Sequence, residues 1–270
     1  MRFSLRMIVS GGALLMALSP LRAQDTRSAD EMVRTAVKTE LAADHADHSL
    51  WRYRDEHKEA DDSVSIVVQT KYGSVSRLIS KGGQPLSQTA AQAEDQRIQS
   101  FIHNSAKLAK EKKDGAQDDK NATELLNMLP EAFKWTVQGE DAKDITLHFA
   151  RNPNFVPPDM QSHVMSTMDG ELVVDRKQNR IATISGKLTQ DVLIGWGILG
   201  RLHAGGTFRV ERRELSPGVW QITETHVDIQ GKALFFKSIG EQQDEVESDF
   251  TRVSPDTTLE QAAEMSKSLK

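Results

Sequence analysis

Residues 195–200 have the spacing G-x-G-x-x-G, which in dinucleotide-binding proteins forms the turn beneath the cofactor. That turn needs a helix directly after the glycines, because the N-terminus of the helix receives the pyrophosphate. Here two more glycines follow, Gly205 and Gly206, and residues 207–213 then alternate like a strand. We therefore predict that the glycines form a corner of a sheet and that no nicotinamide, flavin or other cofactor binds.

Two groups of histidine and acidic residues have a spacing that suits other chemistry. In segment 44–48, Asp-His-Ala-Asp-His, histidine and aspartate lie one helical turn apart, as a surface metal site requires. On a strand, Glu224, His226 and Asp228 would share one face and could act as an acid–base cluster. The simpler interpretations are favoured: a histidine suited to a helix C-terminus, and the exposed face of a sheet. No hydrolase, metalloprotease or Walker motif occurs, so we expect a protein that is not an enzyme and holds no metal.

The N-terminus has the parts of a secretory signal peptide. Two arginines within the first six residues precede a short apolar core over residues 7–18, and Leu-Arg-Ala ends the segment at Ala23. About a dozen apolar residues are too few to span a bilayer. We predict cleavage near Ala23, with a signal peptide over residues 1–23 and one domain over residues 24–270. The mature protein is expected to be periplasmic or secreted, without an integral membrane segment.

The composition excludes several classes of partner and chemistry. The chain has 34 Lys and Arg against 39 Asp and Glu, a formal net charge of −5, and no basic stripe with interleaved aromatic residues. A nucleic-acid partner is therefore not expected. Cysteine does not occur, which excludes disulfides, a thiol nucleophile and the acylated cysteine of a lipoprotein. The sequence gives no indication of the oligomeric state.

Helices are expected where capping residues precede apolar residues at helical spacing. Ser28 with Glu31, and Thr257 with Glu260, form capping boxes. The expected helices cover approximately residues 28–47, 87–108, 122–129 and 257–269. The charged run over residues 110–120 is expected to be a solvated helix end or a loop, and Pro130 to end the third helix.

Strands are expected where apolar and polar residues alternate between turn residues. Their approximate bounds are 49–57, 63–69, 75–79, 133–137, 145–149, 170–175, 180–188, 192–194, 207–213, 219–229, 232–239 and 245–253. Residues 150–158 contain three prolines and are expected to cross in an extended conformation outside the sheet. Strands at this spacing, joined by turns such as Ser216-Pro217-Gly218, predict an α+β fold with one large antiparallel sheet.

Turn and core signatures resemble those of the LolA/LolB-like superfamily of periplasmic carriers and sensors. The similarity is greatest to uncharacterised secreted proteins of acidobacterial type. It extends over approximately residues 49–253 and rests on segments 149–158, 168–175, 195–197 and 218–220 and on the pair Asp249-Phe250. The resemblance implies a curved, unclosed antiparallel barrel with the helices packed on its concave face.

A curved sheet with few helices often leaves a concave apolar space that binds small hydrophobic molecules. The expected lining residues are the strand aromatics Trp135, Phe149, Trp196, Phe208, Trp220 and Phe236. The leading hypothesis is an exported, non-enzymatic binding protein for an acyl chain, a lipid or a lipoprotein anchor. The alternative is a structural or protein-interaction module of the cell envelope whose core is filled by its own side chains. A hydrolase that uses Glu224, His226 and Asp228 is the third hypothesis.

Overall fold

The computed structural model describes residues 27–58, 62–194, 200–233 and 238–267. The predicted signal peptide lies outside these ranges. So do Trp196, Phe236 and most of the glycine-rich segment 195–200. The strand expected after Gly206 is present, because β11 covers Thr207–Ser216.

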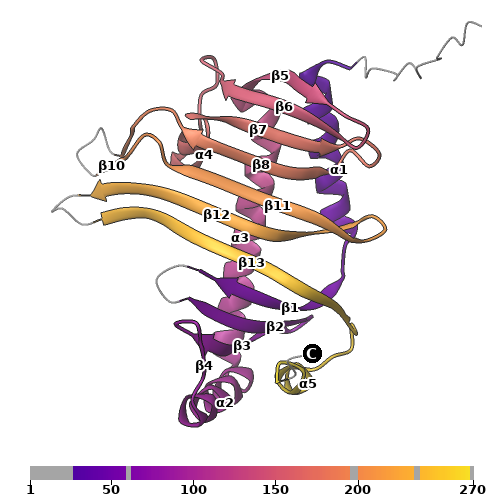
Figure 1. Ribbon diagram of the computed structural model, residues 1–270, viewed down its shortest axis with the longest axis vertical. Coiled ribbons are helices and arrows are strands. Elements are labelled where there is room, and N and C mark those ends of the chain that lie inside the picture. Colours follow the sequence, from indigo (N-terminus) through magenta and orange to yellow (C-terminus); the bar gives the residue numbers. More distant parts are fainter. Residues whose placement is uncertain (1–26, 59–61, 195–199, 234–237, 268–270) are drawn as a thin grey trace, which may run out of the picture.

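The core of the fold is an antiparallel sheet of 13 strands (Figure 1). Strand order is β4-β3-β2-β1-β13-β12-β11-β8-β7-β6-β5, and β10 pairs with both β12 and β9. The two ends of this order do not pair, so the sheet is open. The strands are β1 (Leu50–His57), β2 (Ser63–Thr70), β3 (Gly73–Lys81), β4 (Gln84–Pro85), β5 (Phe133–Glu140), β6 (Asp144–Arg151), β7 (Met168–Asp175), β8 (Ile181–Leu188), β9 (Val192–Ile194), β10 (Gly200–Leu202), β11 (Thr207–Ser216), β12 (Val219–Ala233) and β13 (Ser238–Val253).

Helices lie on both faces of this sheet, whereas the sequence predicted one face only (Figure 1). They are α1 (Ala29–Ala46), α2 (Gln88–Ile102), α3 (Ser105–Ala132), α4 (Met160–Met165) and α5 (Leu259–Met265). The main core packs α1 and the end of α3 against β5 to β8, with Ile229 of β12. A second core packs α2 and α5 against the opposite face at β2 and β3. None of the described helices is long and apolar enough to cross a membrane.

Each helix begins at a capping residue that accepts a hydrogen bond from an early backbone N–H. Ser28 accepts from the N–H of Glu31 at 3.2 Å, as predicted for α1. The capping box of α5 is formed by Thr258 and Gln261, one position later than expected. The short helix α4 was not predicted, although Asp159 caps it through a box with Ser162.

Helix α3 is continuous where the sequence predicted an interruption. It has 28 residues, which gives a length of about 42 Å. The charged run continues the helix because lysine, alanine, glutamine and glutamate have good helix propensity and Lys110 pairs with Asp114 one turn on. Pro130 lies in the last turn rather than ending the helix.

Strands β12 and β13 are longer than predicted. Gly231 was expected in a turn, but β12 continues through it to Ala233. A Cβ at Gly231 would lie 2.3 Å from the carbonyl oxygen of Arg201 on β10. The glycine therefore permits a close backbone approach within the sheet. Strand β13 runs through residues 240–244, where a turn was expected.

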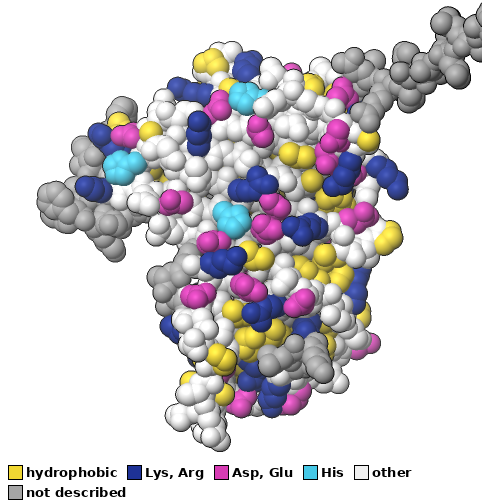
Figure 2. Space-filling view, viewed as in Figure 1, with side chains coloured by type: hydrophobic (Ala, Val, Ile, Leu, Met, Phe, Trp, Pro, Cys, Tyr) yellow, Lys and Arg dark blue, Asp and Glu magenta, His cyan; other side chains and the backbone are white. Residues whose placement is uncertain are grey.

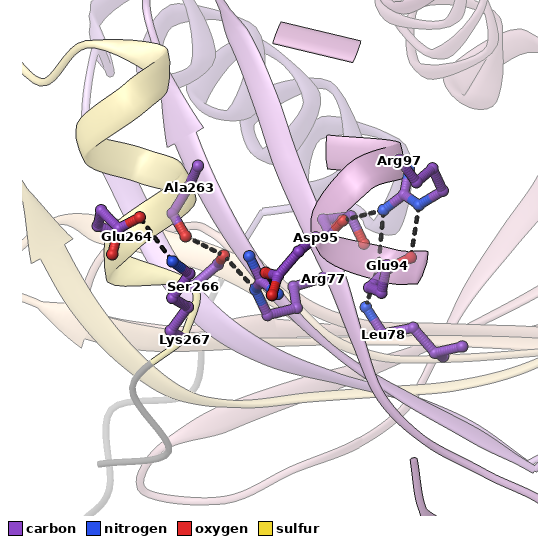
Figure 3. Close-up of polar contacts among 10 residues, drawn as sticks. Arg77, Leu78, Glu94, Asp95, Arg97, Ala263, Glu264, Ser266 and Lys267 are labelled. Atoms are coloured by element: carbon purple, nitrogen blue, oxygen red, sulfur yellow. Dashed lines mark hydrogen bonds and ion pairs between the residues drawn. The ribbon is translucent and has the colours of Figure 1, made fainter. Parts of the chain in front are cut away.

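Polar contacts attach α2 and α5 to β3 (Figure 3). Arg77 of β3 donates to the Asp95 carboxylate of α2 at 2.6 Å and to the hydroxyl of Ser266, directly after α5, at 2.9 Å. Glu94 of α2 accepts from the backbone N–H of Leu78 at 2.8 Å. Through these contacts, α2 and α5 cover one face of the sheet at its β1–β4 end.

Candidate functional site

A hollow of about 900 Å³ lies between the sheet and helices α1, α3 and α4. Its walls are strands β5 to β8 and β10 to β12, and its lining is mainly aliphatic and aromatic. The apolar lining side chains include Leu41, Leu125, Leu126, Leu129, Phe133, Phe149, Val164, Met165, Ile181, Ile184, Leu202, Phe208, Val210, Ile222 and Ile229. Ile222 of this lining keeps 43% of its surface exposed, so part of the apolar lining is accessible to solvent.

Helix α3 forms one wall by crossing the strands rather than packing along them (Figure 1). Near its first end, Glu111 accepts from the backbone N–H of Ser74 at the start of β3, at 3.2 Å. At its other end, Leu129 and Ala132 are buried in the main core. Residues 112–120 between these attachments are exposed throughout. The middle of the helix therefore stands away from the sheet, which leaves room beneath it.

The opposite wall depends on two glycines within strands. Gly170 of β7 and Gly186 of β8 are directly paired across the sheet. A Cβ on Gly170 would lie 2.0 Å from the carbonyl oxygen of Ser185 and 2.7 Å from the Phe149 ring. Added at Gly186, it would lie 2.8 Å from the Phe208 ring. The glycines therefore let both aromatic rings lie against the sheet, and glycine inside a strand pattern was the sequence signal for this.

Three of the six predicted lining residues border the hollow: Phe149, Phe208 and Trp220. Trp135 does not border the hollow: it is buried beside its cross-strand partner Phe149, with the two ring centroids 5.4 Å apart. Its indole N–H donates to the Leu129 carbonyl at 3.2 Å. Trp196 and Phe236 lie outside the described residues.

A charged cluster interrupts the apolar lining at one wall. Glu40 of α1 is 3% exposed, and Arg180 donates to both of its carboxylate oxygens at 3.0 Å. Arg212 of β11 donates to the same carboxylate, and the Ile181 backbone N–H donates to it at 2.6 Å. Burial alone would raise the pKa of Glu40, but hydrogen bonds and charges from the two arginines outweigh it and hold the pKa below its usual value.

Sequence reasoning did not identify this cluster. The signal available was a polar residue within an apolar helical stripe, because Glu40 follows Val33, Ala36 and Val37 at helical spacing. A carboxylate at such a position needs charged or hydrogen-bonding partners. The partners Arg180 and Arg212 could not be assigned, since nothing local to α1 indicates which strand packs against it.

A second charged group lies on the same side of the sheet as the hollow. Val227 and Ile229 of β12 pack in the main core, so Thr225, which pairs with Glu245, shares their face by alternation. Across β13, Glu247 pairs with Asp55 and Glu245 pairs with His57. Burial, and then the charges of Glu245 and Asp55, raise the pKa of Glu247 to about 8.

Donor atoms of Asp55, His57 and Glu245 lie within 4.8 Å of one another, so this group could hold a divalent ion. However, His57 and Asp55 already contact each other at 3.1 Å. Burial, and then the charge of Asp55, raise the pKa of Glu245. The group is a set of closely spaced titratable side chains on strands β1 and β13.

Two residues of the earlier metal candidate, Asp44 and Asp47, line the hollow. Asp47 is the C-cap residue of α1 and accepts from the N–H of Ser49 at 2.8 Å, while His45 and His48 are exposed. Figure 2 shows the sheet face away from α1 and α3, where basic and acidic side chains are mixed. On the adjoining strands β12 and β13, His226 contacts the Asp244 carboxylate at 2.9 Å.

Comparisons with protein-family models, curated proteins and solved structures found no match to this chain.

Proposed function

We propose that this protein is an exported, non-enzymatic binding protein that holds an apolar ligand, such as an acyl chain or a lipid, in the hollow beneath α3. The observation that carries the proposal is a space of about 900 Å³ with a mainly aliphatic and aromatic lining. Small-molecule sites have this size and are typically apolar with a few placed polar groups. The Glu40, Arg180 and Arg212 cluster supplies such groups.

The alternative, a structural or interaction module with a filled core, is less well supported by this packing. Protein interiors are packed to crystal-like density, with few voids larger than a water molecule. This hollow is far larger than such voids, and it is open to solvent, because Asp44, Asp119 and Ile222 of its lining are exposed. An acyl chain would remove the apolar walls from water without requiring hydrogen bonds. We therefore favour ligand binding over a purely structural role.

The affinity expected for such a ligand follows from the buried methylene groups. Each contributes about 0.8 kcal/mol, so about ten of them approach the 8 kcal/mol of a micromolar complex before the cost of immobilisation. A sixteen-carbon chain should therefore bind at micromolar concentration or below. This estimate sets the concentration range of the test.

Export and the LolA/LolB-like resemblance are parts of the same proposal. The segment before Ala23 has the charge and apolar pattern of a secretory signal peptide. A large open antiparallel sheet with helices beside it agrees with the broad architecture that the resemblance implies. N-terminal sequencing of exported protein should begin near Gln24, and an intact Met1 in a membrane fraction would contradict export.

Ligand binding is tested by titrating 1-hexadecanol and hexadecanoic acid into the mature protein. We expect a saturable change in tryptophan emission, because Trp220 borders the hollow, and a higher melting temperature through ligand linkage. Ala122→Trp places a large ring at the lining of α3 and should weaken binding at least about tenfold. Ala116→Trp on an exposed turn of the same helix is the matched control. The absence of both signals with both compounds would favour the interaction module.

A further inference from the structure

The charged cluster in the hollow places two arginines around one carboxylate. Glu40 is ionised, since its pKa is held low, and it faces two permanently charged guanidinium groups, Arg180 and Arg212. The charge of Arg180 also interacts with Glu214, which lies outside the lining and whose pKa it helps to lower. Arg212 has Glu40 as its one acidic contact among the described residues, and it shares that carboxylate with Arg180. An anion bound beside Arg212 would therefore gain a charge-assisted hydrogen bond in apolar surroundings.

The two arginines are not equivalent. Arg180 is buried, and its three nitrogens donate to Glu40 and to the Gly218 carbonyl. Arg212 is 22% exposed at its side chain and lines the hollow. It donates to Glu40 and, at 3.4 Å, to the Trp220 carbonyl. A guanidinium carries five N–H groups, so Arg212 has donors to spare among the described residues.

The other acidic residues of the lining do not neutralise Arg212 by contact. Asp44 and Asp119 are exposed. Asp47 accepts from the Ser49 backbone N–H and from the Gln221 side chain, at 2.8 and 3.1 Å. Its carboxylate is therefore already hydrogen-bonded at the C-terminus of α1.

We propose that the ligand of the hollow carries an acidic head group, a carboxylate or a phosphate, that binds Arg212 while its tail lies along the Phe149 and Phe208 wall. This inference rests on the proposed function and narrows it from apolar molecules to anionic amphiphiles. A guanidinium is well suited to the role because its planar N–H groups match the oxygens of either anion. A neutral lipoprotein anchor would offer Arg212 no charged acceptor.

The test measures the binding of four compounds with the same sixteen-carbon chain to the full mature protein at pH 8. Hexadecanoic acid and hexadecyl phosphate should each bind at least about tenfold more tightly than 1-hexadecanol, since hydrogen bonds to charged groups exceed neutral ones. Hexadecyltrimethylammonium should bind more weakly than the alcohol. Tighter binding of hexadecanoic acid than of hexadecyl phosphate would indicate a fatty-acid ligand, and the reverse order would indicate a phospholipid.

In Arg212→Gln, hexadecanoic acid and 1-hexadecanol should bind with about equal affinity, because the charged donor is lost while the apolar wall remains. Arg213→Gln is the matched control, because Arg213 is the next residue of β11 and pairs with Glu224 at 2.9 Å on the opposite face. Arg212→Lys keeps the positive charge and should retain an intermediate ratio. It also provides a folded comparison if Arg212→Gln lowers stability.

The outcomes separate this inference from the proposed function. If 1-hexadecanol binds the wild-type protein as tightly as hexadecanoic acid, the inference of an acidic head group is wrong. The proposed function, binding of an apolar ligand, is then still supported. An acid preference that persists in Arg212→Gln also overturns the role of Arg212. If none of the four compounds binds, the proposed function itself fails.

Discussion

Glu40 and Arg180 are 140 positions apart in the chain, and yet the guanidinium donates to both carboxylate oxygens at 3.0 Å. The pair joins helix α1 to the residue that directly precedes β8. The Glu40 carboxylate also accepts from the Ile181 backbone N–H at 2.6 Å. One side chain thus fixes the position of α1 on the sheet and forms a wall of the hollow.

We expect Glu40→Gln to destabilise the protein by about 3 kcal/mol, because it leaves two arginines beside an uncharged partner. Glu31→Gln on the exposed face of the same helix should cost less than about 1 kcal/mol. Urea unfolding at pH 7, followed by circular dichroism, measures both values. Equal effects for the two variants would show that the buried cluster contributes nothing specific.

The same cluster should make stability depend on pH on the acid side. The folded pKa of Glu40 lies below its unfolded value of about 4.3, so its contribution is complete above that pH. It is lost as the pH falls through the folded pKa. Melting temperatures from pH 6 down to pH 2.5 should therefore fall more steeply in the wild type than in Glu40→Gln. Parallel curves would contradict the assignment.

Glu247→Gln should stabilise the protein at pH 8. The folded pKa of about 8 exceeds the unfolded value, so wild-type stability falls as pH rises from about 4.3 to 8. We expect a gain of about 1 to 3 kcal/mol after solvent screening, which disappears near pH 4. Thermal unfolding at the two pH values measures it, with Glu224→Gln on β12 as the control. A gain of the same size at both values would argue for improved packing instead.

Gly170→Ala should destabilise the protein by more than about 3 kcal/mol, because the added methyl overlaps the Ser185 carbonyl and the Phe149 ring. Gly139→Ala on β5 meets no atom within 4 Å and should be nearly neutral. Chemical unfolding compares the two. A tolerated Gly170→Ala would mean that strands β7 and β8 do not approach this closely.

Gly115→Ala should stabilise α3 by about 0.5 to 1 kcal/mol. The position is exposed and open in the middle of the helix, and alanine has the higher helix propensity. The expected readouts are slower amide exchange over residues 112–120 and an unchanged affinity for ligand. A loss of stability would indicate that this part of α3 is not helical.

Much of the fold was predictable from local patterns. The start of α1 at Ser28, the alternating strands and the antiparallel pairing depend on neighbouring residues, which a sequence displays directly. Phe149, Phe208 and Trp220 were placed at an apolar space because aromatic residues on one face of a strand indicate a buried surface. The acyl-chain hypothesis and the export signal also came from the sequence alone and stay predictions.

Tertiary structure decided the features that depend on distant residues. The charged segment of α3 is helical and stands away from the sheet because its two ends are attached to β3 and to the main core, which no local pattern specifies. Gly231 lies within a strand rather than a turn because β10 packs closely beside it. Helices cover both faces because α1 and α3 pack on the apolar side of β5 to β8, whereas α2 and α5 pack on the opposite side at β2 and β3. Glu40 is ionised and buried because two arginines, 140 and 172 positions later, reach it only in the folded chain.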